Sequence, residues 1–396
     1  MMRLIKQADD KMQAGVRACF RRMRETARLS SRAVNILCIV CFHALILAVS
    51  ILRKRQSVSH NRLLGTRLCR CCEALGPSFI KLGQVLSARP DLVSPECASE
   101  LARLQTRVRP ISARRIRRVL EQAYVRPFES IFAAFDDEPI GSGSIAQVHR
   151  AQLTDGRVVA VKVRRPGVGE LIGADISLMA LFARMAARLP AFRYMPVGQV
   201  VLELSALISQ QLDFGREAAS NREFRRMFDA VELVKVPVLI DALCRPTILV
   251  MEFVPGLRPM TASGLSLELQ KAAVLRGLRA LYRMVFAEGF IHADLHPGNI
   301  FVRKWGEVVI LDTGLVTRLD DRARRDFVDF FFALVNGDGE RCASILCDSA
   351  LFIAPDCQLV SFQSAIVELV ARYAGLHSRE FEIVRFVKQL METQRQ

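Results

Sequence analysis

The stretch His292-Ala293-Asp294-Leu295-His296-Pro297-Gly298-Asn299 decides how this chain of 396 residues is expected to fold. Within it an acid, Asp294, precedes an amide, Asn299, by five positions, and a second acid, Asp312, follows 18 positions after the first. The apolar run from Val308 to Leu311 predicts a buried strand that ends at Asp312. Two carboxylates and an amide in this order suit a metal ion held beside phosphate groups.

The spacing of Asp294 and Asn299 is that of the kinase catalytic loop H-R-D-x-x-x-x-N. In that loop the Asp orients the nucleophile and the Asn binds magnesium. Asp312 stands where the Asp of a D-F-G segment would bind magnesium, with Thr313 in place of the Phe. We therefore predict Asp294 as a catalytic residue, Asn299 and Asp312 as metal ligands, and ATP and Mg²⁺ as cofactors.

Two β-rich runs upstream, joined by a turn at Thr154-Asp155-Gly156, predict a hairpin that covers a nucleotide. Small residues in the first run would let the backbone approach phosphate, and Lys162 in the second run stands where a kinase lysine contacts the α and β phosphates. Such a turn alone is more often a plain hairpin, but its place before Lys162 and Asp294 makes it specific. The predicted nucleotide-binding residues of the first run are Ile140, Gly141, Ser142, Gly143, Ser144, Ile145, Ala146, Gln147 and Val148.

A single predicted helix carries the segment from Gln211 to Ala218, and one of its carboxylates should pair with Lys162. We choose Glu217 and predict Lys162 and Glu217 as catalytic residues, although an acid on a helix is more often simply solvated. The strand from Thr247 leads into a connector suited to donate backbone hydrogen bonds to adenine at Glu252 to Val254.

Composition narrows the range of partners. The net charge of +16 suits nucleic acid, an anionic membrane surface or a phosphorylated ligand. Only four Tyr and one Trp are present without a basic-aromatic signature, so we predict no nucleic-acid partner. Eleven unevenly spaced cysteines in a chain that needs ATP indicate free thiols. The pairs Cys38-x-x-Cys41 and Cys69-x-x-Cys72 lack a second pair at zinc-finger distance, so we interpret them as small buried hydrophobic residues rather than metal ligands.

One long apolar stretch, Ala33 to Leu52, follows a segment with nine Lys or Arg in residues 1–32. Its 20 residues are enough for a helix to cross a hydrocarbon core about 30 Å thick. Asn35, His43 and Ser50 fall within an arc of about 80°, however, which gives the helix one mildly polar face. Two interpretations of this stretch stay open: a helix embedded in a membrane, and a helix packed on the rest of the protein. We expect an anionic membrane surface as a partner, at the cytoplasmic face of a bacterial inner membrane.

Together these segments resemble the UbiB/AarF group of atypical protein-kinase-like proteins. The resemblance extends over roughly residues 60 to 340 and rests on Lys81-Leu82-Gly83-Gln84, Pro139 to His149, Val159 to Lys162, Glu217-Ala218 and His292 to Asn299. It implies ATP binding with ATPase or small-molecule activity, suppressed protein phosphorylation, and support of ubiquinone biosynthesis. Isoprenoid lipid or quinone-biosynthesis intermediates and enzymes are the implied partners. Lys81 and Gln84 are implied to act at the nucleotide site.

This chain departs from the group near Asp213 and in the nucleotide loop, and Thr106 stands where the group frequently has the Asp of Leu-Gln-Asp. Gln211 stands where an acid is common two residues before Asp213, so only Asp213 carries over from that pattern. Gly141 and Gly143 stand where many members have Ala, which makes the nucleotide loop more like that of an ordinary kinase.

The expected architecture is an α+β, bilobal protein-kinase-like fold with an N-terminal helical extension and an apolar helix that can enter a membrane. The expected ranges are 1–60 for the basic arm and apolar helix, 61–127 for the K-x-G-Q extension, 128–254 for the N-lobe, and 255–396 for a C-lobe without a C-terminal membrane anchor. Two other functions stay open. One is a small-molecule phosphotransferase of the aminoglycoside-kinase type, because those enzymes share the H-x-D-x-H-P-x-N loop. The other is a non-catalytic, nucleotide-gated scaffold for lipids or proteins.

Overall fold

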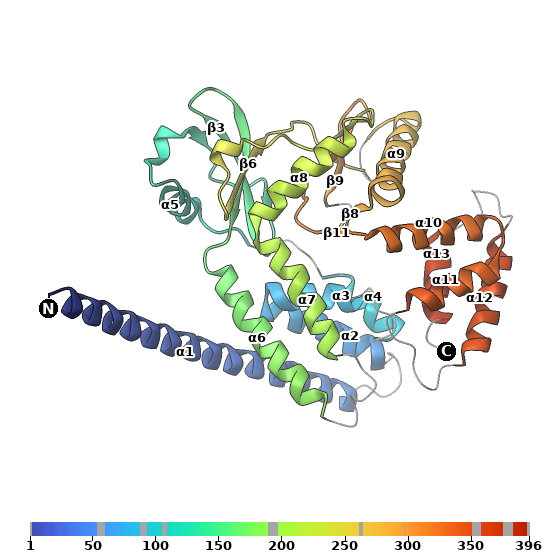
Figure 1. Cartoon of the computed structure of the whole chain (residues 1–396), viewed down its shortest axis with the longest axis horizontal. Coiled ribbons are helices and arrows are strands. Elements are labelled where there is room, and N and C mark those ends of the chain that lie inside the picture. Colours follow the sequence, from blue (N-terminus) through green and yellow to red (C-terminus); the bar gives the residue numbers. More distant parts are fainter. Residues whose placement is uncertain are drawn as a thin grey trace. The chain divides into compact units, whose positions relative to one another are not determined.

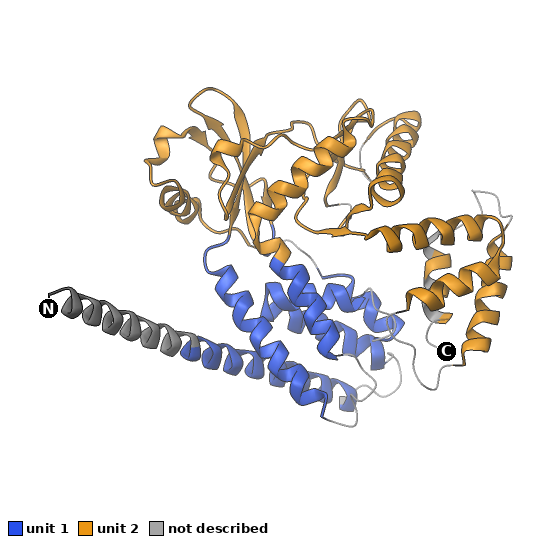
Figure 2. Ribbon diagram, in the orientation of Figure 1, with its two compact units in different colours: residues 1–108, 143–145, 165–209 blue, residues 109–142, 146–164, 210–396 orange. Residues whose placement is uncertain are grey.

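The computed structural model describes residues 2–53, 60–87, 93–104, 109–188, 197–260, 264–296, 298–350, 358–374 and 383–393, with side chains at most of these positions from residue 26 on. Contacts divide the chain into two compact units (Figure 2). Unit 1 comprises residues 1–108, 143–145 and 165–209, and unit 2 comprises residues 109–142, 146–164 and 210–396. The predicted ranges follow chain order, whereas these units follow contacts and join residues 165–209 to the N-terminal helices.

Unit 2 contains a five-stranded sheet with the order β1-β3-β4-β6, in which the short strand β2 also pairs with β3. Strands β3 and β6 of this sheet are labelled in Figure 1. All pairings are antiparallel. The strands are β1 (Phe132–Phe135), β2 (Gly141–Ser142), β3 (Ala146–Leu153), β4 (Val158–Arg164) and β6 (Ile248–Glu252). The predicted hairpin is confirmed: β3 and β4 are joined through Gly156, whose φ of 88° suits glycine.

The alternation of side chains along β4 gives the sheet two different faces. Val159, Val161 and Val163 enter a core shared with helix α5 (Ala113–Tyr124). Ala160 enters a separate core shared with helix α8 (Phe214–Phe228). Lys162 lies two residues after Ala160, so the pleat directs it to the side of the sheet that α8 covers.

The second half of unit 2 is built from short strands and helices. The predicted strand before Asp312 is β10 (Val308–Ile310), which pairs with β9 (Ile300–Val302) and β5 (Val234–Lys235), while β7 (Arg258–Pro259) pairs with β9. β8 (Phe290–His292) pairs with β11 (Val316–Arg318). Helix α9 (Leu267–Tyr282) is continued by a π-helical turn, Arg283–Glu288, that ends at Gly289. The described residues after β11 form the helices α10 (Asp321–Val335), α11 (Gly339–Ser349), α12 (Leu359–Tyr373) and α13 (Ile383–Thr393).

The single helix predicted over Gln211 to Ala218 is wrong. Helix α7 (Val197–Leu212) ends there, and Asp213 has extended backbone angles before α8 begins. The Asp213 carboxylate accepts hydrogen bonds from the backbone N–H groups of Gly215 and Arg216, at 3.0 and 3.3 Å. A side chain that satisfies the free N–H groups of a first helical turn favours a new helix start over continuation of the old helix.

Unit 1 is helical. Its elements are α1 (Met2–Arg53), α2 (His60–Leu75), α3 (Pro77–Ser87), α4 (Pro95–Leu101), α6 (Val168–Ala186) and most of α7. Within α1, the segment Thr26–Leu52 is long and apolar enough to cross a membrane, judged by length and composition alone.

The cysteine predictions divide between two helices. Cys69 and Cys72 on α2 are buried with Cys97, as small hydrophobic residues, and burial raises the pKa of the Cys72 thiol to about 12. Cys38 and Cys41 on α1 are exposed, so the prediction of burial is wrong for them. Their positions face away from the helices on which α1 packs.

A buried carboxylate, Asp175 on α6, joins three helices of unit 1. Arg32 on α1 donates to both of its oxygens, at 2.6 and 3.1 Å, and Ser78 on α3 donates to it at 2.7 Å. Arg32 also donates to the Leu75 carbonyl at 2.6 Å. Asp175 is fully buried, so its charge depends on these donors.

Replacing Arg32 with Met should destabilise unit 1 by about 3 kcal/mol, because removing one partner of a buried pair leaves the other charge uncompensated. Arg28→Met is the matched control on the same helix. Arg28 pairs with Glu170 at 2.7 Å, but both side chains are more than half exposed, so its loss should cost less than about 1 kcal/mol. Urea unfolding of the two variants in detergent measures both losses of stability. Equal losses would contradict the claim that the buried Asp175 carboxylate depends on Arg32.

Candidate nucleotide-binding and catalytic site

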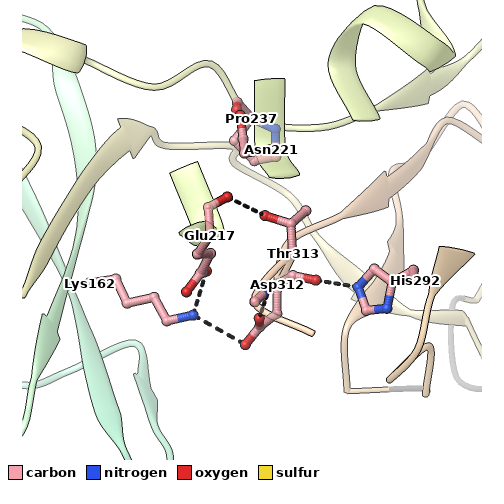
Figure 3. A network of polar contacts seen from close by, with 8 residues as sticks. Lys162, Glu217, Asn221, Pro237, His292, Asp312 and Thr313 are labelled. Atoms are coloured by element: carbon pink, nitrogen blue, oxygen red, sulfur yellow. Dashed lines mark hydrogen bonds and ion pairs between the residues drawn. The ribbon is translucent and has the colours of Figure 1, made fainter. Parts of the chain in front are cut away.

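Three predicted site residues meet in unit 2 (Figure 3). Lys162 on β4 donates to Glu217 Oε1 on α8 at 2.6 Å and to Asp312 Oδ2 at 3.2 Å. Glu217 is buried, whereas the side chain of Asp312 is 44 % exposed. The arrangement holds one ammonium group between two carboxylates, and of the two acids Asp312 is the one accessible to a ligand.

The position of Glu217 is fixed by its place in the first turn of α8 and by the segment after Asp312. Thr313 is buried and donates to the Glu217 carbonyl at 3.3 Å. A Cβ at Gly314 would lie 3.2 Å from Glu217 Oε2 and 3.1 Å from Asp312 Oδ1, so a glycine allows the chain to approach both carboxylates. The Gly314 N–H donates to Asp312 Oδ1 at 2.9 Å.

Burial and charge act on the three groups in opposite directions. Burial raises the pKa of Glu217 to about 7, a shift that Lys162 opposes and Asp312 supports. Burial also raises the pKa of Asp312, but Lys162 and the Gly314 N–H outweigh it, so the net shift is downward. The pKa of Lys162 is lowered by burial but raised more by Asp312 and Glu217, so the ammonium stays charged. With all three ionised, the cluster carries one net negative charge, which favours a divalent cation.

His292 links the loop that carries Asp294 to the segment that begins at Asp312. It is buried, its Nδ1 accepts from the Asp294 N–H at 3.2 Å, and its Nε2 contacts the carbonyl oxygen of Asp312. Since Nδ1 accepts, Nε2 carries the proton and donates to that carbonyl. Burial lowers the pKa of His292, which favours this neutral form.

Asp294 and Asn299 lie in the same loop and are joined directly. The Asn299 side chain donates to the Asp294 carbonyl at 2.9 Å, and the Asn299 carbonyl accepts from the N–H of Leu311, the residue before Asp312. Both side chains are half-buried. Pro297 of this loop lies outside the described residues.

The donor set fits magnesium that is shared with a nucleotide. Asp312, Asn299 and Asp294 offer oxygen atoms, which hard cations prefer. Among the described residues, no cluster of three or more His, Cys, Asp or Glu side chains is arranged as a complete metal site. Magnesium at phosphate sites uses one or two carboxylates plus phosphate oxygens, so this arrangement suits a nucleotide-bound ion.

One predicted nucleotide-binding residue, Gln147, has a different role. Gln147 is fully buried, and its amide exchanges two hydrogen bonds with the backbone of Ile111, at 2.9 and 3.1 Å. It also contacts buried His149 at 2.7 Å, whose ring stacks on Phe135. The side-chain amide of Gln147 is therefore engaged within the protein on the α5 side of the sheet, so we do not propose it as a nucleotide ligand. The Gln-x-His pattern reflects two residues on one face of a strand.

Of the remaining residues of the predicted nucleotide segment, Ile140 directly precedes β2, and the others lie on β2, on β3 and in the loop between them. Ile140 donates its N–H to the Val148 carbonyl at 2.8 Å, and Gly141 is paired with Val148. In unit 1, Arg165 holds the tip of this loop: its guanidinium donates to the Gly143 carbonyl and its N–H donates to the Ile145 carbonyl, both at 2.8 Å.

The structure reduces the number of backbone N–H groups from Glu252 to Val254 that are available to adenine. The Glu252 N–H donates to the Val238 carbonyl at 2.8 Å, and the Phe253 N–H donates to the Val158 carbonyl at 3.3 Å. The Glu252 side chain pairs with Lys235 at 2.5 Å. Two of the three predicted backbone donors are thus used within the protein, and the N–H of Val254 is the one that stays assigned to adenine.

Lys81 and Gln84 lie half-buried on α3 in unit 1. The glycine between them has a packing role, because a Cβ at Gly83 would lie 2.3 Å from Leu104 Cδ1 and 3.3 Å from Cys72 Sγ. The K-x-G-Q segment therefore requires glycine for close helix packing.

Sequence reasoning did not assign site roles to His292, Thr313 and Gly314. His292 is the first residue of the quoted loop, and the two others directly follow Asp312. Their positions next to the predicted site residues are visible in the sequence. Their contacts in the folded structure show that they position Asp312 and Glu217.

Comparisons with known proteins show the family and the fold of this chain. Residues 103–346 match the family model described as ABC1 atypical kinase-like domain. The chain is 37 % identical over 328 residues to "Probable protein kinase UbiB" of Aeromonas hydrophila and 36 % identical over 317 residues to that of Vibrio cholerae. These alignments cover 79 % and 77 % of the chain but 58 % of each relative, so the chain spans little more than half of their length.

Among solved structures, the chain resembles the complex of Rv3197 with erythromycin from Mycobacterium tuberculosis. The TM-score is 0.50 at 19 % sequence identity, and the match covers 93 % of both chains. This likeness concerns the fold alone and agrees with the expected kinase-like α+β architecture. From the family model and these relatives, the chain belongs to the UbiB/AarF family of atypical kinase-like proteins.

Proposed function

We propose that this protein binds Mg-ATP in unit 2 and acts as an atypical kinase or ATPase that supports ubiquinone biosynthesis at a membrane. The observation that carries the proposal is the contact of Lys162 with both Glu217 and Asp312. In kinases a lysine paired with a helix glutamate contacts the α and β phosphates, and a nearby aspartate holds the metal. Here all three groups are brought together from a strand, a helix and the end of another strand.

Each residue has a role that follows from its surroundings. Glu217 is buried and orients Lys162, so the ammonium group can contact phosphate without leaving its position over the sheet. Asp312 and Asn299 would hold Mg²⁺, which neutralises charge on the phosphates when bound. Asp294 lies five residues before Asn299 in the same loop and would orient the attacking hydroxyl or water. His292 holds the loop at Asp294 next to the segment at Asp312, because it contacts the backbone of both residues.

The link to quinone metabolism is supported by the names of the relatives, "Probable protein kinase UbiB". Isoprenoid lipid intermediates or the enzymes that handle them are the proposed partners, and Lys81 and Gln84 are proposed to act at the nucleotide site. A quinone profile tests this part: the chain should restore ubiquinone in a bacterial strain lacking UbiB.

Asp294→Asn should lower the rate of ATP hydrolysis by about 100-fold or more, since a positioned acid or base contributes a factor of at least this size. The fold should be unaffected, because the backbone hydrogen bonds of Asp294 to His292 and Asn299 are kept in the variant. ATP turnover by the purified protein is the measurement.

Asp320→Asn is the control for this variant. Asp320 caps α10 by accepting from the Ala323 N–H at 2.7 Å, and Asn caps a helix equally well. It should leave turnover unchanged. Equal turnover in the Asp294 variant and wild type would contradict the catalytic assignment, and absent turnover with intact nucleotide binding in wild type would favour a scaffold.

A further inference from the structure

The helix segment Thr26–Leu52 has two distinct faces. Its half-buried positions recur at three- and four-residue steps and are Leu29, Arg32, Ala33, Ile36, Ile39, His43, Ile46, Leu47 and Ser50. These positions lie within roughly half of the helix circumference, and they face the neighbours of α1 in unit 1, which are α2 and α6. Of the mildly polar arc, His43 and Ser50 are therefore turned toward protein, whereas Asn35 is exposed.

The opposite face of the same segment is apolar and exposed. Val34, Leu37 and Leu45 are each 60 to 65 % exposed, and Phe42 is 59 % exposed. With Cys38, Cys41 and Leu52 they lie within an arc of roughly 140° at 100° per residue. We call these seven residues the outer face of α1. A continuous apolar strip of this kind on a folded unit marks an interaction surface.

The inner face makes it costly for α1 to cross a bilayer. A crossing helix of about 20 residues is within hydrocarbon along its length. Here α2 and α6 lie against that length in unit 1 (Figure 1), and they carry Arg62, Arg67 and Glu170. These charged helices would have to enter hydrocarbon with α1, or α1 would have to give up the buried Arg32–Asp175 pair.

We propose that α1 lies in the plane of an anionic lipid surface, with its outer face in the headgroup and acyl boundary, and does not span the membrane. Charge supports lipid as the occupant, because residues 1–32 carry nine Lys or Arg against three acids and the chain carries a net charge of +16. An amphipathic helix joined to a basic segment is the usual form of such an interfacial anchor. The inference deepens the membrane part of the proposed function and fixes the geometry of attachment.

Vesicle binding tests the outer face. The full-length protein should co-sediment with vesicles of phosphatidylcholine and phosphatidylglycerol, and Leu37→Glu with Leu45→Glu should weaken that binding at least 10-fold. Leu275→Glu with Leu278→Glu on α9 is the matched control, because these leucines are also about half exposed but belong to unit 2. Equal loss in both double variants would overturn the assignment. Failure of the wild type to bind vesicles would also overturn the assignment. This includes the outcome in which the wild type forms a dimer and the Leu37 and Leu45 changes dissociate it.

Depth measurements separate an in-plane helix from a spanning one. The chain has a single tryptophan, Trp305, so Trp305→Phe provides a background for single reporters. Val34→Trp, Phe42→Trp and Leu52→Trp are then each reconstituted from detergent into vesicles containing lipids brominated at different depths. Equal, shallow quenching at the three positions is expected, since all three lie on the outer face. Deep quenching at position 42 with shallow quenching at 34 and 52 would show a spanning helix and overturn the proposal. ATP turnover in detergent tests the proposed catalysis separately from these results.

Discussion

Replacing Asp312 with Asn should lower ATP turnover by about 100-fold or more and remove most of the magnesium-dependent stabilisation by ATP. The reason is that the half-exposed Asp312 carboxylate supplies charge to the metal, and a metal at a transferring phosphate contributes several kcal/mol. The amide oxygen of Asn can still accept from the Gly314 N–H, so the local fold should persist. Thermal unfolding with ATP, in the presence and absence of Mg²⁺, measures the loss.

Asp338→Asn serves as the comparison, because Asp338 caps α11 at the Arg341 N–H and touches none of the site residues. Its ATP-dependent shift should equal that of wild type. If the Asp312 variant kept the full magnesium-dependent shift, the metal assignment would be wrong.

Replacing Lys162 with Met should destabilise the protein by about 3 kcal/mol at pH 8 and by clearly less at pH 5.5. Loss of the ammonium group leaves the buried Glu217 carboxylate without a counter-charge, which is costly. The pKa of Glu217, already raised to about 7 by burial, rises further because Lys162 no longer opposes the shift. Between the pKa of Glu217 in the unfolded chain and its higher pKa in the folded variant, only the folded protein keeps the proton. The free energy of unfolding of the variant therefore falls as the pH rises through this range.

Two further variants check this explanation. Lys162→Met with Glu217→Gln should recover part of the stability and lose the pH dependence between pH 5.5 and 8, because no buried acid remains at that position. Lys235→Met breaks a pair with Glu252 in which both side chains are about one-third exposed, so it should cost less than about 1 kcal/mol at either pH. A pH-independent loss in the single Lys162 variant would refute the role given to Glu217.

Much of the fold and the strand that leads to Asp312 could be predicted because their signals are local. An apolar run before Asp312 becomes β10, and the alternation of Val and Ala before Lys162 gives that residue its face of the sheet. The Lys162–Glu217 contact was also correctly chosen, since kinase chemistry requires an acid on the covering helix.

Other features depend on contacts between residues distant in the sequence. Gln147 lies in the β-rich run that is predicted to cover the nucleotide, but Ile111, 36 positions earlier, provides the backbone groups that bond its side-chain amide. The break at Asp213 was hidden because a helix-capping Asp and a helix-surface Asp look alike without backbone angles. The backbone donors of Glu252 and Phe253 are likewise satisfied by partners that periodicity does not identify.

The junction at Asp175 carries an evolutionary consequence. Arg32, Ser78 and Asp175 are far apart in the sequence, yet each stabilises the others' placement in a buried position. A substitution at Arg32 alone leaves an unsatisfied charge, whereas simultaneous replacement of Arg32 and Asp175 by apolar residues of similar volume does not. The first step of such a replacement is therefore disfavoured even when the end point is tolerated. Residues 32 and 175 should change together across related chains, and the apolar helix and the K-x-G-Q helix should be inherited as one structural module.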